Sequence, residues 1–314
     1  MLSQKGNVVI LILLLVSLLS IFLIALKLKF YFPTQSLSNI SLLNQNKDLM
    51  GLINEDQLSL YTIPSDVLAA LNLAKTEGRP VLGIRADGPT YHIPILIYHY
   101  VEHVQDSGDK IRISLNTLPE VLDKQIETLV QAGYSFITAS ELADILDGIK
   151  PAPSKPVMLT FDDGYRDFYI DAFPILKKYN VKAVNYVVSG FINLPNNLTD
   201  AQLKEIVESG LVEIGAHTVH HLALAGLSDS QLAFEVGQSK IQLEQHLGFP
   251  ITAFAYPYGS FDIHAIQSVK QAGFRTAVST LSGAQLSNSV RFFVSRLRPG
   301  GNTGQSLLNL LQNN

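Results

Sequence analysis

The 314-residue sequence contains no cysteine and no tryptophan, and only 16% of its residues are charged. Without cysteine there can be no disulfide bond, thiolate metal ligand or cysteine nucleophile, so a metal site must use histidine, carboxylate or water ligands. The net charge of −4 comes without a long basic block, which argues against nucleic acid as a partner. A hydrophobic content of 47% excludes a disordered chain and allows a large core.

One long apolar run lies close to the N-terminus. Residues 8–26 are apolar except for Ser17 and Ser20, and as a helix rising about 1.5 Å per residue they would span roughly one bilayer core. The run is long for a signal peptide, and no small-x-small cleavage site follows it promptly. We therefore expect residues 1–29 to be an uncleaved transmembrane anchor, with a cleaved signal peptide as the alternative.

The remainder of the chain changes texture at about residue 91. Residues 30–90 are rich in Ser, Asn, Gln and Leu without clear periodicity, and we interpret them as a stalk that contains one short helix. Residues 91–314 instead alternate short apolar runs with amphipathic stretches, as expected for a parallel sheet with helical crossovers. The predicted strands are 93–99, 135–138, 156–161, 182–188, 212–216, 252–256, 276–279 and 292–297. The predicted helices are 119–132, 140–149, 167–179, 200–209, 229–247 and 263–272.

Seven or eight strand–helix units over about 220 residues predict an α/β fold with a closed or nearly closed barrel, in which chemistry belongs at the C-terminal ends of the strands. Polar residues stand at four such ends. They are His99 after the first strand, Asp162 and Asp163 after 156–161, His217, His220 and His221 after 212–216, and Pro257–Gly259 after 252–256. Each pattern alone is common in turns or packed cores, but their joint placement favours one functional site.

The residue types define the chemistry of that site. Two imidazoles and one carboxylate make a three-ligand site for a divalent metal, with a position left for water. The second aspartate then remains free to take a proton from that water. A dication would also offset the repulsion between two adjacent carboxylates.

Three motifs resemble those of the polysaccharide deacetylases, the group that includes the nodulation-factor chitooligosaccharide deacetylases. They are TFDDG at 160–164, HTVHH at 217–221 and YPYG at 256–259, and the resemblance covers about residues 93–300. It implies a distorted (β/α) barrel of about seven to eight strands and metal-dependent removal of acetyl groups from sugars. It further implies Asp162 as the catalytic base, the backbone N–H of Tyr258 as the oxyanion donor, and Asp163, His217 and His221 as ligands of Zn²⁺ or another divalent ion.

The sequence departs from the family pattern at two catalytic positions, and, having no tryptophan, it also lacks the aromatic residue of the usual fourth motif. Ala255 stands where an arginine usually supports the base, and Arg296 and Arg298 are the two candidates to replace it. The late histidine motif that usually supplies the general acid is missing. An early Tyr-His pair in ILIYHYV, residues 95–101, is similar to the poly-N-acetylglucosamine deacetylase branch and indicates His99 as the acid.

The sequence thus predicts a hydrolase that removes N-acetyl groups from an N-acetylglucosamine polymer, either an exopolysaccharide of biofilms or cell-wall peptidoglycan. The catalytic domain would face the extracytoplasmic side of the cell membrane, on a single-pass anchor. Two alternatives stay open at this point. One is a degenerate domain that binds polysaccharide without turnover, and the other is an esterase acting on O-acetyl groups of xylan.

The anchor prediction can be checked by fractionating cells that produce the full chain. We expect the mature protein in the membrane fraction with residues 8–26 still attached, because their apolar length matches a bilayer core. N-terminal sequencing of soluble protein that begins near residue 30 would contradict it.

Overall fold

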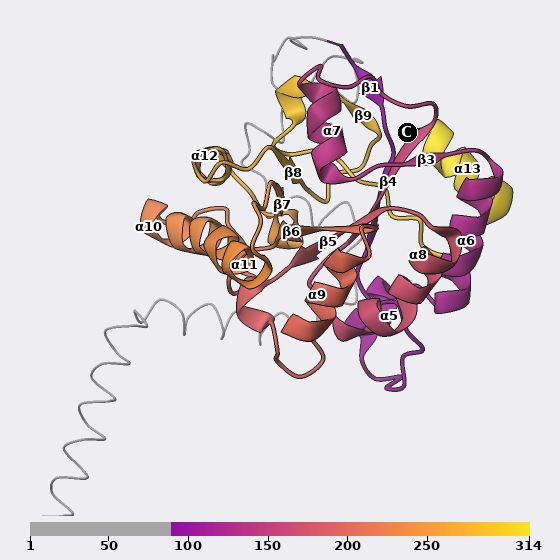
Figure 1. The fold of residues 1–314 in the computed structure, drawn as a ribbon, viewed down its shortest axis with the longest axis horizontal. Coiled ribbons are helices and arrows are strands. Elements are labelled where there is room, and N and C mark those ends of the chain that lie inside the picture. Colours follow the sequence, from indigo (N-terminus) through magenta and orange to yellow (C-terminus); the bar gives the residue numbers. More distant parts are fainter. Residues whose placement is uncertain (1–88) are drawn as a thin grey trace, which may run out of the picture. The chain divides into compact units, whose positions relative to one another are not determined.

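The structure, a computed structural model, describes residues 89–314. Along this part of the chain, short strands rich in Val, Ile and Phe alternate with amphipathic helices. Six strands form a parallel sheet in the order β2-β4-β5-β6-β7-β8, and β3 pairs with β4 beside them. The sheet is curled into a half-barrel with helices around it (Figure 1), in agreement with the predicted (β/α) barrel. The strands are β2 Ile95–Tyr98, β3 Ser135–Phe136, β4 Pro156–Phe161, β5 Ala183–Val187, β6 Val212–Ala216, β7 Ala253–Ala255 and β8 Thr276–Val278.

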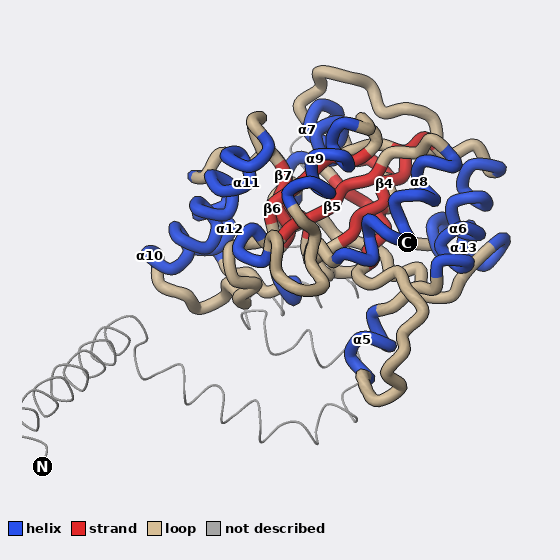
Figure 2. The backbone as a smooth tube through the Cα atoms, turned by 60° about the horizontal axis from the view of Figure 1, so that its bottom comes forward, coloured by secondary structure: helices blue, strands red, loops and turns tan. Residues whose placement is uncertain are grey.

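Helices lie on both sides of the curved sheet, with α10, α11 and α12 towards one side and α6, α8 and α13 towards the other (Figure 2). The α-helices are α5 Lys110–Leu115, α6 Pro119–Gln131, α7 Ala139–Leu146, α8 Phe173–Tyr179, α9 Asp200–Glu208, α10 Asp229–Leu232, α11 Ser239–Leu247, α12 Ile263–Gln271 and α13 Gly304–Gln312. Two π-helices, η3 Phe168–Ala172 and η5 Ala233–Gln238, precede α8 and α11. Short 3₁₀ turns are η4 Ser189–Phe191, η6 Pro257–Gly259 and η7 Asn288–Val290, and β1 Tyr91–His92 pairs with β9 Gln285–Leu286.

Both faces of the sheet are buried, which explains why its strands read as continuous apolar runs. On β4, Val157, Leu159 and Phe161 pack into the core shared with α6 and α8, while Met158 joins a second core beneath α7. The strand ends are therefore the places where polar side chains can emerge from the sheet.

The gap between the edge strands β8 and β2 is spanned by an extended segment, residues 294–297. Val294 N–H donates to Ala277 O (2.9 Å), and Leu297 N–H donates to Ile95 O (2.7 Å). The predicted strand at 292–297 is therefore wrong as a regular strand, because only isolated bridges form at Val294 and Leu297. The segment nevertheless occupies the place in the sheet that the strand was expected to fill.

Most predicted elements are confirmed to within a few residues, and two helices need correction. The helix predicted at 229–247 is interrupted by η5, and the helix predicted at 167–179 begins as η3. Among residues 89–314 no helix is long and apolar enough to cross a membrane. The predicted anchor and stalk lie outside the described residues.

Candidate functional site

Three strand ends deliver the predicted site residues to one place. Asp162 and Asp163 follow β4, His217 follows β6, and η6 with Tyr258 follows β7. The ladder extends just past the strands, since Asp162 N–H donates to Tyr98 O (2.9 Å) and His217 N–H donates to Val187 O (3.0 Å). The side chains are therefore held by the rigid sheet rather than by free loops.

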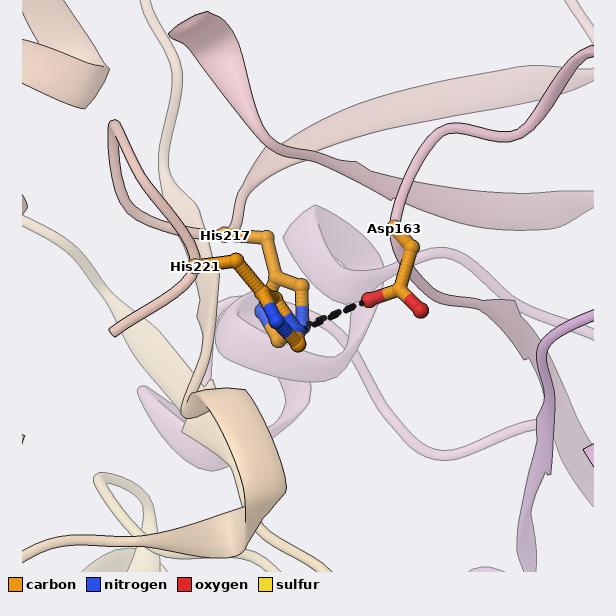
Figure 3. Close-up of side chains that lie close together, drawn as sticks. All are labelled: Asp163, His217 and His221. Atoms are coloured by element: carbon orange, nitrogen blue, oxygen red, sulfur yellow. Dashed lines mark ion pairs between the residues drawn. The ribbon is translucent and has the colours of Figure 1, made fainter. Parts of the chain in front are cut away.

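Asp163, His217 and His221 form the candidate metal centre, and Figure 3 shows the two imidazoles side by side, facing the carboxylate. Asp163 Oδ1 lies 3.2 Å from His217 Nε2 and 3.0 Å from His221 Nε2. The three potential ligand atoms lie within 4.8 Å of one another, and Asp163 and His217 are buried. The geometry thus brings together the three ligands predicted from the sequence.

The hydrogen bonds around this centre test whether a metal ion fits it. His217 Nδ1 donates to Ala255 O (2.7 Å), because a carbonyl can only accept, and this leaves Nε2 available as a ligand. Asp163 Oδ1 is buried and has no hydrogen-bond partner within residues 89–314, although two imidazole nitrogens lie close to it. A buried carboxylate oxygen that lies beside two ring nitrogens without hydrogen-bond geometry is the arrangement expected of three ligand atoms around a cation.

The charges at the centre point the same way. Burial by itself would raise the pKa of the Asp163 carboxyl, but the imidazoles of His217 and His221 hold this pKa well below its usual value. Burial would lower the pKa of His217, whereas the carboxylates of Asp163 and Asp162 raise it above the ordinary histidine value. Asp163 is therefore an anion at neutral pH that attracts positive charge to this position.

Asp162 has a cation of its own. Arg296 binds it with two parallel hydrogen bonds of 2.7 Å, Nη1 to Oδ1 and Nη2 to Oδ2, and both side chains are buried. Arg296 Nε also donates to Ser279 O (2.8 Å), which fixes the guanidinium plane. Of the two arginines that the sequence left open at this position, the structure places Arg296 against Asp162.

This pair decides the ionisation of Asp162. Burial would raise the pKa of its carboxyl, but the Arg296 guanidinium, by charge and by hydrogen bonding, holds the pKa below its usual value. Asp162 is consequently ionised at neutral pH without contacting the metal ligands through a hydrogen bond. It remains available as a proton acceptor next to the metal centre.

Three histidines outside the metal centre, His99, His103 and His264, lie in different surroundings and can be compared as candidates for the general acid. His99 directly follows β2 and is largely buried, and its Nδ1 has no hydrogen-bond partner among residues 89–314. Burial lowers its pKa, and the nearby charges of Asp162 and Asp163 partly offset that effect. His264 is exposed on α12, 3.6 Å from Asp229, and His103 is exposed, 3.4 Å from Glu120.

Tyr258 contributes more than the backbone position predicted for it. Its hydroxyl lies 3.1 Å from His221 Nδ1, and the two rings meet edge to face at 4.6 Å. Its φ of 59° is left-handed, and its backbone N–H donates to no other residue in the described part of the chain. No motif in the sequence indicated that its side chain contacts His221, a candidate metal ligand.

Comparisons with known proteins show what this chain is similar to. The sequence profile described as polysaccharide deacetylase matches residues 149–277. The chain is 30% identical over 229 residues to YxkH of Bacillus subtilis (strain 168), which is provisionally named a polysaccharide deacetylase; the match covers 73% of this chain and 78% of YxkH. Over 238 residues it is 27% identical to the poly-beta-1,6-N-acetyl-D-glucosamine N-deacetylase of Escherichia coli (strain K12), covering 62% of this chain.

The chain spans only 35% of the length of that Escherichia coli protein. Among solved structures, it is similar to the Streptococcus pyogenes deacetylase PplD in complex with acetate. The TM-score is 0.66 and the identity 33%, and the match covers 71% of this chain and 98% of PplD. The similarity therefore extends over most of this chain and nearly all of PplD.

The first prediction from this geometry separates the two aspartates. His217→Ala and His221→Ala should each lose bound Zn²⁺, and Asp163→Asn should weaken binding, because these residues supply the three ligand atoms. Asp162→Asn should bind Zn²⁺ as the wild type does. Zinc content after gel filtration measures this, and full content in either histidine variant, or equal loss in both aspartate variants, would show that the ligands are misassigned.

The second prediction concerns the buried ion pair. Arg296→Met leaves Asp162 buried without a cation, which should cost about 3–5 kcal/mol of unfolding free energy near neutral pH. The native pKa of Asp162 is depressed, so the pair stabilises the protein above the unfolded-state pKa. In folded Arg296→Met, burial without the guanidinium should raise the pKa of Asp162. The loss of unfolding free energy should therefore shrink as acid protonates this carboxyl, towards and below about pH 4.

Thermal unfolding across pH measures this deficit. Lys178→Met is the control, since Lys178 pairs with Asp123 at the surface and should leave Tm nearly unchanged. An Arg296→Met protein as stable as the wild type at pH 7 would mean that the pair does not hold Asp162 in its ionised state.

Proposed function

This chain belongs to the polysaccharide deacetylase family, and we propose that it hydrolyses N-acetyl groups of an N-acetylglucosamine-containing polysaccharide. The observation that carries the proposal is the separation of the two aspartates. Asp163 joins two histidines in a metal centre, and Asp162 is kept ionised beside it by Arg296. Amide hydrolysis needs both a Lewis acid and a base, and this arrangement provides for each.

Asp163, His217 and His221 would hold Zn²⁺ or another divalent ion, which when bound would polarise the acetyl carbonyl and make water more acidic. Asp162 would take the proton from the attacking water, and Arg296 would keep its two oxygens oriented. The Tyr258 N–H, which donates to no other described residue, would donate to the oxyanion of the tetrahedral intermediate. His99 would donate a proton to the departing amine.

The arginine contact weakens the case for a domain that only binds polysaccharide. That alternative was motivated by the missing arginine at Ala255 and by the missing late histidine. Arg296 reaches Asp162 from a different segment and makes the bidentate contact that a supporting arginine requires. His99, in a largely buried position after β2, is the corresponding candidate for the missing acid.

The substrate and the location of the enzyme belong to the same proposal. We place the domain outside the cytoplasm, anchored by residues 1–29, where exopolysaccharide and peptidoglycan are found. The support is the length of the apolar run in the sequence and the name of the matched Escherichia coli relative.

Acetate release tests the proposed function. The metal-loaded protein is incubated in parallel with a β-1,6-linked N-acetylglucosamine oligomer, peptidoglycan and acetylxylan, with Asp162→Asn as the control. We expect acetate from one of the N-acetylated substrates, loss of release after chelation and recovery with Zn²⁺. Release from acetylxylan alone would assign the esterase activity instead, and no release from any of the three would favour a binding protein.

The general acid yields a further prediction. His99→Ala should fold and retain zinc, but its kcat should drop by about 10²–10⁴, the usual contribution of a positioned acid or base. His264→Ala should change kcat little, because its ring is exposed and beside Asp229. The alkaline limb of the pH profile, which reports loss of the acid's proton, should disappear only in the His99 variant. Near-normal turnover by folded His99→Ala would remove it from the mechanism.

A further inference from the structure

The loop that follows His217 and ends at His221, residues 218–221, has an unfavourable backbone. Thr218 has a φ of 66° and His221 a φ of 57°, and neither is a glycine. Left-handed non-glycine residues of this kind are unfavourable and persist only where surrounding contacts hold them. One such contact is internal, since His221 N–H donates to Thr218 Oγ1 (2.9 Å).

The second contact comes from outside the loop, from Glu235 in the π-helix η5. Glu235 is only 3% exposed, and its Oε2 accepts hydrogen bonds from Val219 N–H (3.1 Å) and His220 N–H (2.9 Å). Its Oε1 lies 2.8 Å from His220 Nδ1. One carboxylate therefore binds two consecutive backbone N–H groups and one side chain of the segment that separates His217 from His221.

The described partners of this carboxylate all belong to the loop 218–221. In the region from residue 89 onwards Glu235 forms no ion pair with lysine or arginine, and the side chain of His220 is the one that contacts it. The His220 ring is stacked on Phe234 at 5.8 Å with an interplanar angle of 8°. A buried carboxylate needs hydrogen-bond partners, and the partners of Glu235 come from the loop 218–221, so this side chain is committed to that loop.

We infer that Glu235 is a positioning residue for the metal centre, acting through the loop 218–221 to hold His221 opposite His217. His220, which has no assigned role in the sequence motif, contacts this carboxylate through its Nδ1. Glu235 lies in the π-helix η5, where an inserted residue shifts which side chain of the helix faces the neighbouring loop. Such π-turns recur at functional sites.

The inference rests on the metal centre of the proposed function, and zinc affinity tests it without any turnover. The variants are Glu235→Ala, Glu235→Gln and His220→Ala, each assayed as full chain by zinc competition with a chromophoric chelator and by the visible spectrum of bound Co²⁺. Glu213→Ala is the matched control. Glu213 lies near the opposite end of β6 and likewise accepts from a backbone N–H (2.9 Å) and a hydroxyl (2.8 Å), both of Ser140.

We expect Glu235→Ala to bind Zn²⁺ about 10–100-fold more weakly, the usual effect of removing a group that orients a ligand, and to alter the Co²⁺ spectrum. Glu235→Gln should lose less, because its amide oxygen can still accept from both N–H groups. His220→Ala should lose least, since the backbone contacts remain. Glu213→Ala should lower Tm but leave zinc affinity within about twofold. If the role of Glu235 were purely structural, Glu235→Ala would give this same result.

Zinc affinity of Glu235→Ala within about twofold of wild type, with an unchanged Co²⁺ spectrum, would overturn the inference while leaving the metal centre intact. Wild-type protein without zinc affinity would overturn the metal centre and this inference with it. If Glu235→Ala does not fold, Glu235→Asp replaces it: the charge stays but the reach is one methylene shorter. Weakened zinc binding by the aspartate variant supports the inference, and unchanged binding overturns it.

Discussion

Two adjacent carboxylates, buried at the end of an apolar strand, are the constraint on which the site depends. Neither carboxylate could remain ionised there without a positively charged partner. If both bound the same cation, both would act as its ligands and neither would be left to accept a proton. The chain provides two separate solutions. Asp162 is bound by Arg296 through two hydrogen bonds, and Asp163 faces the imidazoles of His217 and His221. Consecutive side chains on an extended strand point in opposite directions, and the left-handed φ of 75° at Asp163 marks where the strand geometry ends. Different surroundings thus distinguish two identical residues, in line with the roles we propose for them, metal ligand for Asp163 and base for Asp162.

The fold brings these partners together from distant parts of the sequence. The ligand histidines follow β6, two strands away from β4 in the sheet order. Arg296 lies on the segment 294–297, which is hydrogen-bonded to β8 on one side and to β2 on the other. The same residues that span the gap in the sheet therefore carry the guanidinium to Asp162. Placing His221 takes more than the sheet, because it lies beyond the strand in a loop with two left-handed residues. There the contacts of Glu235 supplement the backbone.

The sequence predicted the part of the site that follows from strand ends. Asp163, His217 and His221 stand directly after or close to predicted strands, and a parallel sheet necessarily gathers such residues along one edge. Arg296 could be named only as one of two candidates, because its approach to Asp162 depends on how the segment after β8 crosses to β2. Glu235 was missed, since a π-turn inside a predicted continuous helix changes which residue faces the loop. The helices α5 and α13 were also missed. The segment predicted as a strand at 292–297 pairs with each neighbouring strand at a single position and therefore forms isolated bridges.

The central claim is that the two aspartates have separate cations, and a crystal structure of the zinc-loaded protein, with anomalous diffraction at the zinc edge, tests it most directly. The account predicts one anomalous peak bounded by Asp163, His217 and His221, at about 2.0–2.2 Å from the two nitrogens and the carboxylate oxygen. Asp162 should remain paired with Arg296 and outside the coordination sphere. A peak coordinated by both aspartates, or an Asp162 carboxylate that has left Arg296 to bind zinc, would contradict the account.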